Sequence, residues 1–512
     1  MALNTGKWDI DVKSVLSVLV EMSTFYTKFV GKCFIYITQR FRRELIFLSL
    51  DWMRFFSEIY HESTQYIPHG SGDPVIMHWE KQAYADKRYE GCNRYPFTAA
   101  FMPLLAPVSA DYLNPVCVYA VVHGGEVPDG VYYVDREDSK LVKLGGVDVR
   151  RAILAAFPEQ EFITEAQTIF IYTGLLERAV WRFREAAYRQ VQMDVGSACA
   201  NTILLAKSRG QKVFALGGFV DDSIAVSLKL GATEMPMAAI AVFPEKSMVA
   251  FNSVDDGVGE LAYSNHAEMG AYAGEDECRM EISRYPSRFM LQNRLENIDD
   301  LKLCMKVRRL NAQALPGDEF PLTPSKFTNE YYLRELWYLR TDKKVAAPFV
   351  HGTLDLDDLS SMLRWLELAQ LNAFGAGLIK ISVVVFDVMF VYAGVYRYIP
   401  VRKSIYMQSG SANPKKFNKC FAVPEQVQNS MFAVVLTSNL NESCQVLGNR
   451  GYRYMNLNAG VLAESLYVSA RLLNKTAREE HFFYHDELKK LLDIPETESI
   501  ISTVVIGKSP AR

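Results

Sequence analysis

The sequence lacks the marks of several protein classes. It has eight cysteines in 512 residues, but they form no CxxC pair and have no zinc-ligand spacing with histidine. This argues against a disulfide framework and against a metal site, and it favours a reduced, cytoplasmic setting. The first eleven residues are polar and contain no apolar signal-peptide core.

Long apolar runs and an excess of one charge are also absent. The most apolar stretch, residues 381–396, contains Asp387 and is too short to span a bilayer as a helix. The formal net charge of -3 offers no basic surplus for nucleic acid or an anionic membrane. Apolar and charged fractions of 49% and 22% are those of an ordinary globular protein. We therefore expect neither a nucleic-acid nor a membrane partner.

What the sequence does contain is an internal repeat at an offset of 264 residues. The stretch 188–196 falls on 452–460, and both begin with Tyr-Arg and end with Gly. The same offset pairs Gly130-Val131-Tyr132 with Gly394-Val395-Tyr396, Thr173 with Thr437, Phe219 with Phe483, Asp222 with Asp486, and Thr233-Glu234 with Thr497-Glu498. One offset held without a gap over this span predicts two tandem copies of one domain.

Each copy mixes strand and helix patterns. Strands are predicted at 116–122, 130–134, 168–172 and 238–243 in the first copy and at 383–386, 432–437 and 500–506 in the second. Helices are predicted from Gly196 to Arg209, with Gly210 after the end, and over 461–473. The second copy also has a predicted helix at 331–338, a basic turn at 340–344 and a helix capped by Thr353. These patterns predict an α+β fold in which helices cover mostly antiparallel sheets.

The repeat sets the expected domain boundaries. We expect a helical N-terminal extension and leader segment over 1–95 and a first domain, with a truncated start, over 96–246. A connecting segment follows over 247–320, and the second domain covers 321–512.

Four groups of residues, in their order and spacing, resemble the nitroreductase superfamily. They are Ser109-Ala110 followed by 115–119, the hairpin 130–133, the helix start 187–201, and Gly217-Gly218-Phe219 with Asp221-Asp222. Within the superfamily the chain is similar to the SagB-type dehydrogenases, flavin enzymes that oxidise azolines in ribosomal peptide natural products. The resemblance covers most of the chain beyond residue 60, twice over. It implies two tandem nitroreductase-like domains that form an intrachain pseudo-dimer, with further homodimerisation left open.

The resemblance implies FMN as the cofactor. The cofactor-binding residues that it implies are Ser109, Asn201, Gly217, Gly218, Arg340, Lys343, Gly375, Gly377 and Lys508. Basic side chains suit a flavin phosphate, and glycines let the backbone approach the flavin ring. Arg340 and Lys343 stand where the family has its phosphate motif, in the second copy only. The glycine pair stands in the first copy only, because its counterparts are His481 and Phe482. We expect at most one complete flavin site.

Arg182 and Tyr188 are the catalytic candidates. Azoline-oxidising relatives carry a Lys-Tyr pair just before the Tyr-Arg stretch, where this chain has Arg182-Phe183. Arginine stays protonated, so Arg182 can stabilise an anion such as reduced flavin but is a poor general base. Tyr188 has a structural reading as a core aromatic, and His61 has both a structural and a site reading.

The resemblance favours an FMN-dependent oxidoreductase that dehydrogenates a peptide-derived or related natural-product intermediate. Its partners would be a peptide or small natural-product substrate and other biosynthetic enzymes. Two alternatives stay open: an NAD(P)H-dependent nitro or quinone reductase, and a catalytically degenerate scaffold or binding subunit of a biosynthetic complex.

Overall fold

The computed structural model describes residues 56–66, 91–97, 113–125, 127–158, 160–244, 319–326, 348–370, 378–410 and 412–510, together with Lys87, Tyr89, Ser109 and Phe374. The predicted helix at 331–338 and the basic turn at 340–344 lie outside these residues. Among the described helices, none combines the length and apolar character needed to cross a membrane.

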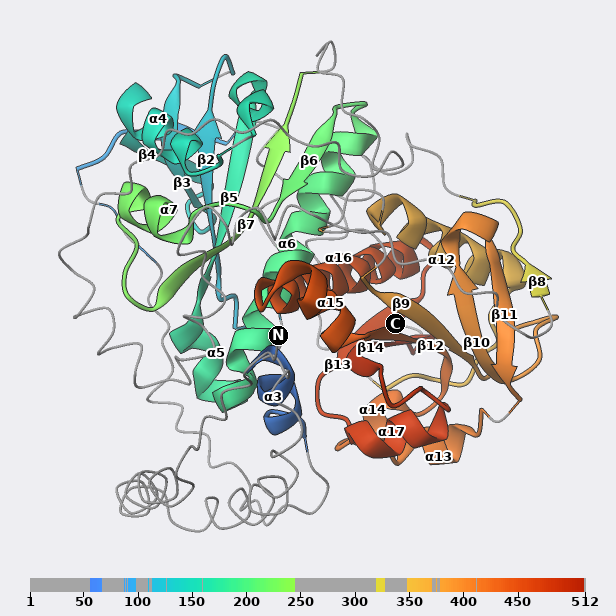
Figure 1. Cartoon of the computed structure of the whole chain (residues 1–512). Coiled ribbons are helices and arrows are strands. Elements are labelled where there is room, and N and C mark those ends of the chain that lie inside the picture. Colours follow the sequence, from blue (N-terminus) through green and yellow to red (C-terminus); the bar gives the residue numbers. More distant parts are fainter. Residues whose placement is uncertain are drawn as a thin grey trace, which may run out of the picture. The chain divides into compact units, whose positions relative to one another are not determined.

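Each copy contains one seven-stranded antiparallel sheet (Figure 1). The first sheet consists of β1 (Arg94–Pro96), β2 (Val116–Val122), β3 (Gly130–Asp135), β4 (Lys140–Gly145), β5 (Thr168–Leu175), β6 (Val213–Leu216) and β7 (Glu234–Val242). The second consists of β8 (Glu319–Pro321), β9 (Lys380–Val385), β10 (Gly394–Ile399), β11 (Ser404–Ser409), β12 (Ser430–Ser438), β13 (Thr476–Glu480) and β14 (Ser499–Gly507).

The two sheets have the same topology. The first runs β1-β4-β3-β2-β5-β7-β6, and the second, read from its other edge, runs β8-β11-β10-β9-β12-β14-β13. From β2 and β9 onward, strands in corresponding places are counterparts at the offset of 264, whereas the edge strands β1 and β8 correspond only by their place in the sheet. The prediction of two tandem α+β domains with mostly antiparallel sheets is confirmed.

A repeated contact anchors the closing strand of each copy, by which we mean its last strand in the sequence, β7 or β14. Thr173 Oγ1 donates to Glu234 at 2.5 Å, and Thr437 Oγ1 donates to Glu498 at 2.7 Å. Both glutamates are buried at the start of the closing strand, where a carboxylate needs such partners. The repeated Thr and Glu positions thus have a structural role.

Helices lie on both faces of the sheets. The first copy has α4 (Val147–Ala155), α5 (Leu176–Phe183), α6 (Ala187–Ser208) and α7 (Asp221–Leu228), with short 3₁₀ turns at Glu161–Glu165 and Arg184–Ala186. The second has α12 (Leu356–Gln370), α13 (Pro414–Asn418), α14 (Pro424–Val427), α15 (Leu440–Leu447), α16 (Arg450–Leu472) and α17 (His485–Leu491), with a 3₁₀ turn at Pro400–Arg402. A further helix, α3 (Phe56–Ser63), precedes both sheets.

Three predicted helix starts were wrong. α6 and α16 begin nine and eleven residues earlier than expected, so the repeated Tyr-Arg stretches are helical themselves. Thr353 does not cap α12. The helix begins at Leu356, and the carbonyl of Asp355 accepts the first amide hydrogen bonds, from Asp358 and Leu359. Gly210 follows α6 with a φ of +68°, the left-handed geometry that the sequence predicts for a residue after a helix end.

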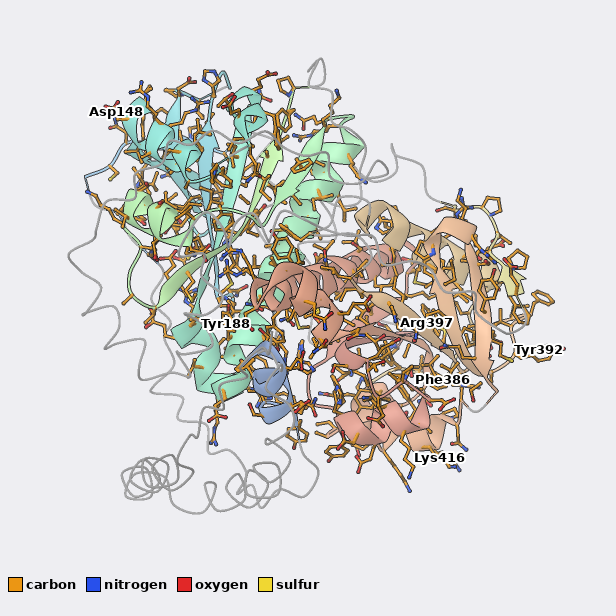
Figure 2. The ribbon with its side chains drawn as sticks, viewed as in Figure 1. Asp148, Tyr188, Phe386, Tyr392, Arg397 and Lys416 are labelled. Carbon is orange, nitrogen blue, oxygen red and sulfur yellow. The ribbon has the colours of Figure 1, made fainter. Side chains whose placement is uncertain are left out.

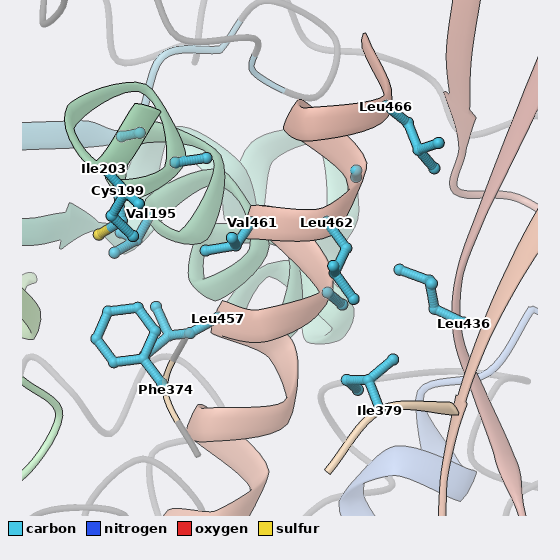
Figure 3. Close-up of a cluster of buried hydrophobic side chains, with 14 of the residues drawn as sticks. Val195, Cys199, Ile203, Phe374, Ile379, Leu436, Leu457, Val461, Leu462 and Leu466 are labelled. Carbon is cyan, nitrogen blue, oxygen red and sulfur yellow. The ribbon is translucent and has the colours of Figure 1, made fainter. Parts of the chain in front are cut away.

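The core is organised around the pair α6 and α16. Val195, Cys199 and Ile203 of α6 and Leu457 and Val461 of α16 belong to one buried cluster, which continues to the facing sides of the sheets (Figure 3). Almost every residue of α16 is buried, as is typical of a helix at the centre of a large core.

The two helices approach most closely at a pair of glycines. A β-carbon on Gly196 would overlap the carbonyl oxygen of Leu457, and one on Gly460 would overlap that of Met193. Met193 and Leu457 are counterparts in the repeat, as are the two glycines. The contact is therefore reciprocal, and it depends on the absence of side chains at both positions.

Candidate functional site

The crossing of α6 and α16 creates two counterpart junctions between the copies. In the Asp221 junction, residues 217–221 of the first copy meet Arg450, Arg453 and Tyr454 of the second. In the His485 junction, residues 481–485 of the second copy meet Arg182, Phe183 and the α3 segment. The offset of 264 carries 217–221 onto 481–485. The two junctions can therefore be compared position by position.

A buried ion pair closes the Asp221 junction. The carboxylate of Asp221 accepts hydrogen bonds from Arg450 at 2.8 and 2.9 Å and from Arg453 at 3.0 and 3.1 Å. All three side chains are at most 2% exposed. Burial alone would raise the pKa of Asp221, but the two guanidinium groups outweigh it and hold the pKa below its usual value. The carboxylate is therefore ionised, and it joins the two copies.

Protein groups already occupy the surroundings of the glycine pair. The carbonyl of Gly217 accepts from Arg450 Nε at 3.0 Å, and that of Gly218 accepts from Gln160 Nε2 at 2.7 Å. A β-carbon on Gly217 would lie 2.6 Å from the ring of Tyr454. The close approach that glycine permits at 217 thus serves an aromatic ring of the other copy.

Aromatic side chains fill the corresponding part of the His485 junction. The ring of Phe183 stacks on Phe482 with centroids 5.7 Å apart, and the guanidinium of Arg182 lies 4.6 Å from the same ring. Phe183 also meets His481 edge-on at 5.8 Å. Phe482 is the counterpart of Gly218. The junction therefore brings together the first catalytic candidate and the altered glycine-pair position.

Two histidines are buried in this junction. Nδ1 of His61 lies 3.2 Å from the hydroxyl of Tyr452, and its ring centroid lies 5.8 Å from that of His485. Nε2 of His485 accepts the backbone N–H of Ile500 at 3.0 Å. Burial, followed by Lys489 and Arg189, lowers the pKa of His485 to about 3. Burial and Arg189 hold the pKa of His61 well below its ordinary value. Both imidazoles are therefore neutral near pH 7.

Three other candidate residues contact the protein itself. Ser109 Oγ donates to Asp194 at 2.7 Å and accepts from the amide of Asn114, which fixes the segment before β2 on α6. Asn201 Nδ2 donates to Glu464 at 2.8 Å between the two central helices. Tyr188, near the start of α6 (Figure 2), is buried, and its ring lies edge-on to that of Tyr60 with centroids 6.1 Å apart. Each of these three side chains thus has partners within the protein.

One basic candidate lies exposed at the end of the second sheet. Lys508 follows β14, its carbonyl accepts from the amide of Val350, and its side chain runs beside Gly352. Its counterpart in the first copy is Pro244, which has no charge. An exposed ammonium group such as that of Lys508 is free of the steric packing that surrounds Gly217 and Gly218, and its charge is of the kind that suits a phosphate. Arg340, Lys343, Gly375 and Gly377 lie outside the described residues.

Sequence reasoning missed the ion pair. The pattern around Asp221 predicts only a flavin-side loop, and no local pattern singles out Arg450. A signal was present, since the offset that preserves Asp222 as Asp486 turns Asp221 into His485. Within the described residues, no group of three or more His, Cys, Asp or Glu is placed to hold a metal ion.

The comparisons with known proteins agree with this architecture. Residues 106–242 match the model of the nitroreductase family. A nitroreductase-like protein of Methanocaldococcus jannaschii is 27% identical over 126 residues, which are 25% of this chain and 64% of that protein. The match therefore spans less than two thirds of the relative's length.

A solved structure extends the likeness to both copies. The crystal structure of a nitroreductase-like protein of Anabaena variabilis superposes with a TM-score of 0.73 at 19% identity, covering 89% of this chain and all of that one. At this identity the likeness concerns the fold. The chain thus has the nitroreductase fold in two copies, and its residues 106–242 match the model of the nitroreductase family.

Proposed function

We propose that the protein is an FMN-dependent oxidoreductase with one flavin site per chain, held by the second copy. The observation that carries the proposal is the exposed ammonium group of Lys508 at the end of the second closing strand. Its counterpart, Pro244, offers the first copy no such group. In the proposed site Lys508, Arg340 and Lys343 bind the phosphate, which basic side chains recognise through charge-assisted hydrogen bonds.

The bound flavin would supply hydride acceptance. The residues of the chain would bind and orient the flavin and stabilise the charge that develops on it. Arg182 is the candidate for stabilising negative charge, because a guanidinium stays protonated and its packing on Phe482 fixes its position. The substrate we propose is a peptide-derived or related natural-product intermediate, as the SagB-type resemblance implies, with oxygen as the final electron acceptor.

A specific observation favours a second candidate function. The glycine pair of one junction is packed by Tyr454 and Arg450, and its counterpart in the other carries the side chains of His481 and Phe482. A degenerate scaffold or binding subunit of a biosynthetic complex would tolerate both changes. An NAD(P)H-driven nitro or quinone reductase differs from the proposed dehydrogenase in requiring an external reductant.

Lys508→Ala tests the proposal, with Lys416→Ala as the matched control on an exposed lysine of α13 (Figure 2). A hydrogen bond to a charged group contributes about 1.5–3 kcal/mol, so the affinity for added FMN should fall by roughly tenfold or more in Lys508→Ala only. Equal FMN affinity in the two variants would contradict the proposed site. Anaerobic mixing with NAD(P)H then separates a reductase, whose flavin bleaches, from a dehydrogenase.

A further inference from the structure

A short segment before the first sheet bridges both copies. The segment, residues 56–66, contains α3, and we call it the strap (Figure 1). On the second copy, Ser57 Oγ donates to Asn449 Oδ1 at 2.8 Å. On the first copy, the hydroxyl of Tyr60 donates to the carbonyl of Glu185 at 2.5 Å, and Arg189 donates to the hydroxyl and the carbonyl of Thr64, both at 3.1 Å.

The strap contacts the His485 junction, which has no counterpart of the Asp221 ion pair. At the Asp221 junction, Arg453 binds the carboxylate of Asp221. Its counterpart Arg189 meets the strap, because position 485 carries an imidazole in place of a carboxylate. A salt bridge between buried groups resists opening, since separating it leaves uncompensated charge. The strap contacts at the His485 junction are hydrogen bonds and ring contacts, which separate at less cost.

The end of the strap covers an aromatic surface. The ring of Tyr66 stacks on Tyr484 with centroids 5.6 Å apart and meets Phe482 edge-on at 5.7 Å. Phe482 is also the ring over which Arg182 lies. Tyr66 is 44% exposed, so it lies at the outer edge of the junction. Departure of the strap would uncover Phe482 and Tyr484 beside the catalytic candidate.

Positively charged groups lie near His61 of the strap. Arg189 of α6 and Lys489 of α17 bring positive charge near His61, while His485 of α17, Tyr452 of α16 and the amide of Ile500 in β14 are its neutral neighbours. On the strap itself, Glu58 binds Asn441, and Glu62 is exposed. Asp486 lies 4.0 Å from Nδ1 of His485, but its side chain is 86% exposed. A proton added to His61 would thus meet like charge in a buried place.

We propose that the strap is a pH-sensitive cover of the His485 junction, docked at neutral pH and released in mild acid, which uncovers the 481–484 loop beside Arg182. The inference rests on the proposed function only for the role of the surface uncovered. The docked strap requires a neutral His61, whereas a released His61 regains an ordinary pKa near 6.5. Below that pH the released state binds a proton that the docked state excludes. At pH 5.5 the opening equilibrium should therefore rise about tenfold.

Hydrogen–deuterium exchange on the full chain tests this at pH 7.5 and 5.5, corrected for the intrinsic pH dependence of exchange. We expect peptides covering the strap to exchange about tenfold faster at pH 5.5, while peptides over 217–221 stay protected. His61→Gln should remove the acid response of the strap.

Three results would overturn the proposal: equal exchange at the two pH values, the same acid response in His61→Gln, and simultaneous loosening of the strap and the 217–221 loop. The measurement needs no flavin. A protein without FMN would contradict the proposed function and leave the test of the strap intact.

Discussion

The side chains of Asn456 and Gln192 meet between α16 and α6, where Asn456 Nδ2 donates to Gln192 Oε1 at 2.9 Å. The two residues are counterparts, separated by the repeat offset of 264. A residue that contacts its own counterpart lies on a local twofold axis, as in the interface of a symmetric dimer. The exchanged contacts of Gly196 and Gly460 obey the same symmetry. One chain therefore builds the pseudo-dimer that two protomers would otherwise form.

The close crossing of α6 and α16 predicts a strict requirement for glycine. Gly196→Ala should destabilise the protein by about 3 kcal/mol, because the new methyl group overlaps a backbone carbonyl that cannot move without displacing α16. Gly460→Ala should behave alike. Urea unfolding measures the effect, and Gly231→Ala, which has open space around it, is the control with an expected change within about 0.5 kcal/mol. Equal stability of Gly196→Ala and the control would exclude the tight crossing.

The ion pair at the Asp221 junction predicts that Asp221→Asn, although it conserves side-chain size, strongly lowers the free energy of unfolding. Asp221→Asn keeps the size of the side chain but leaves two buried arginines without a carboxylate, so the free energy of unfolding should fall by about 3–5 kcal/mol. Asp148→Asn is the matched control, because the Asp148 side chain is 99% exposed at the surface (Figure 2). If both variants unfold at the same urea concentration, the ion pair does not join the copies.

The direction of the pKa shift of Asp221 determines how the contribution of this ion pair to stability depends on pH. The pKa of Asp221 is lower in the folded than in the unfolded protein, so its contribution to stability is complete above about pH 4 and is lost as the pH falls further. The difference in unfolding free energy between wild type and Asp221→Asn should therefore be constant from pH 5 to 8 and shrink below pH 4. A difference that changes with pH between 5 and 8 would show that another group titrates with the pair.

The buried His485 predicts that acidification lowers the stability of the protein already at a pH above the range in which Asp221 titrates. Its folded pKa of about 3 lies below the unfolded value near 6.5, so the unfolded chain binds a proton first as the pH falls. At pH 5 this should lower the free energy of unfolding by about 2 kcal/mol relative to pH 7. His485→Gln should remove this component, since an amide oxygen can also accept the N–H of Ile500. A variant with an unchanged pH profile would contradict the assignment to His485.

The repeat made the duplication of the fold readable from the sequence, because one offset of 264 relates six of the seven strands in each sheet. Contacts between the copies were harder to predict. Gly217 and Gly218 suggested a ligand, but Tyr454 and Arg450, more than 230 positions away, use that space. Asn201 lies within a helix pattern, and nothing local indicates that its partner is Glu464 on α16. Such long-range pairs arise from the crossing of α6 and α16, which periodicity alone does not encode.

We propose that one flavin site has survived in a duplicated nitroreductase fold. The most direct measurement is the absorbance spectrum of the purified full-length protein, before and after incubation with FMN, with the released flavin quantified against protein. We predict about one FMN per chain, lowered in Arg340→Ala and in Lys508→Ala. Two flavins per chain would contradict the asymmetry between Lys508 and Pro244, and a colourless protein that takes up no FMN would leave the scaffold function in its place.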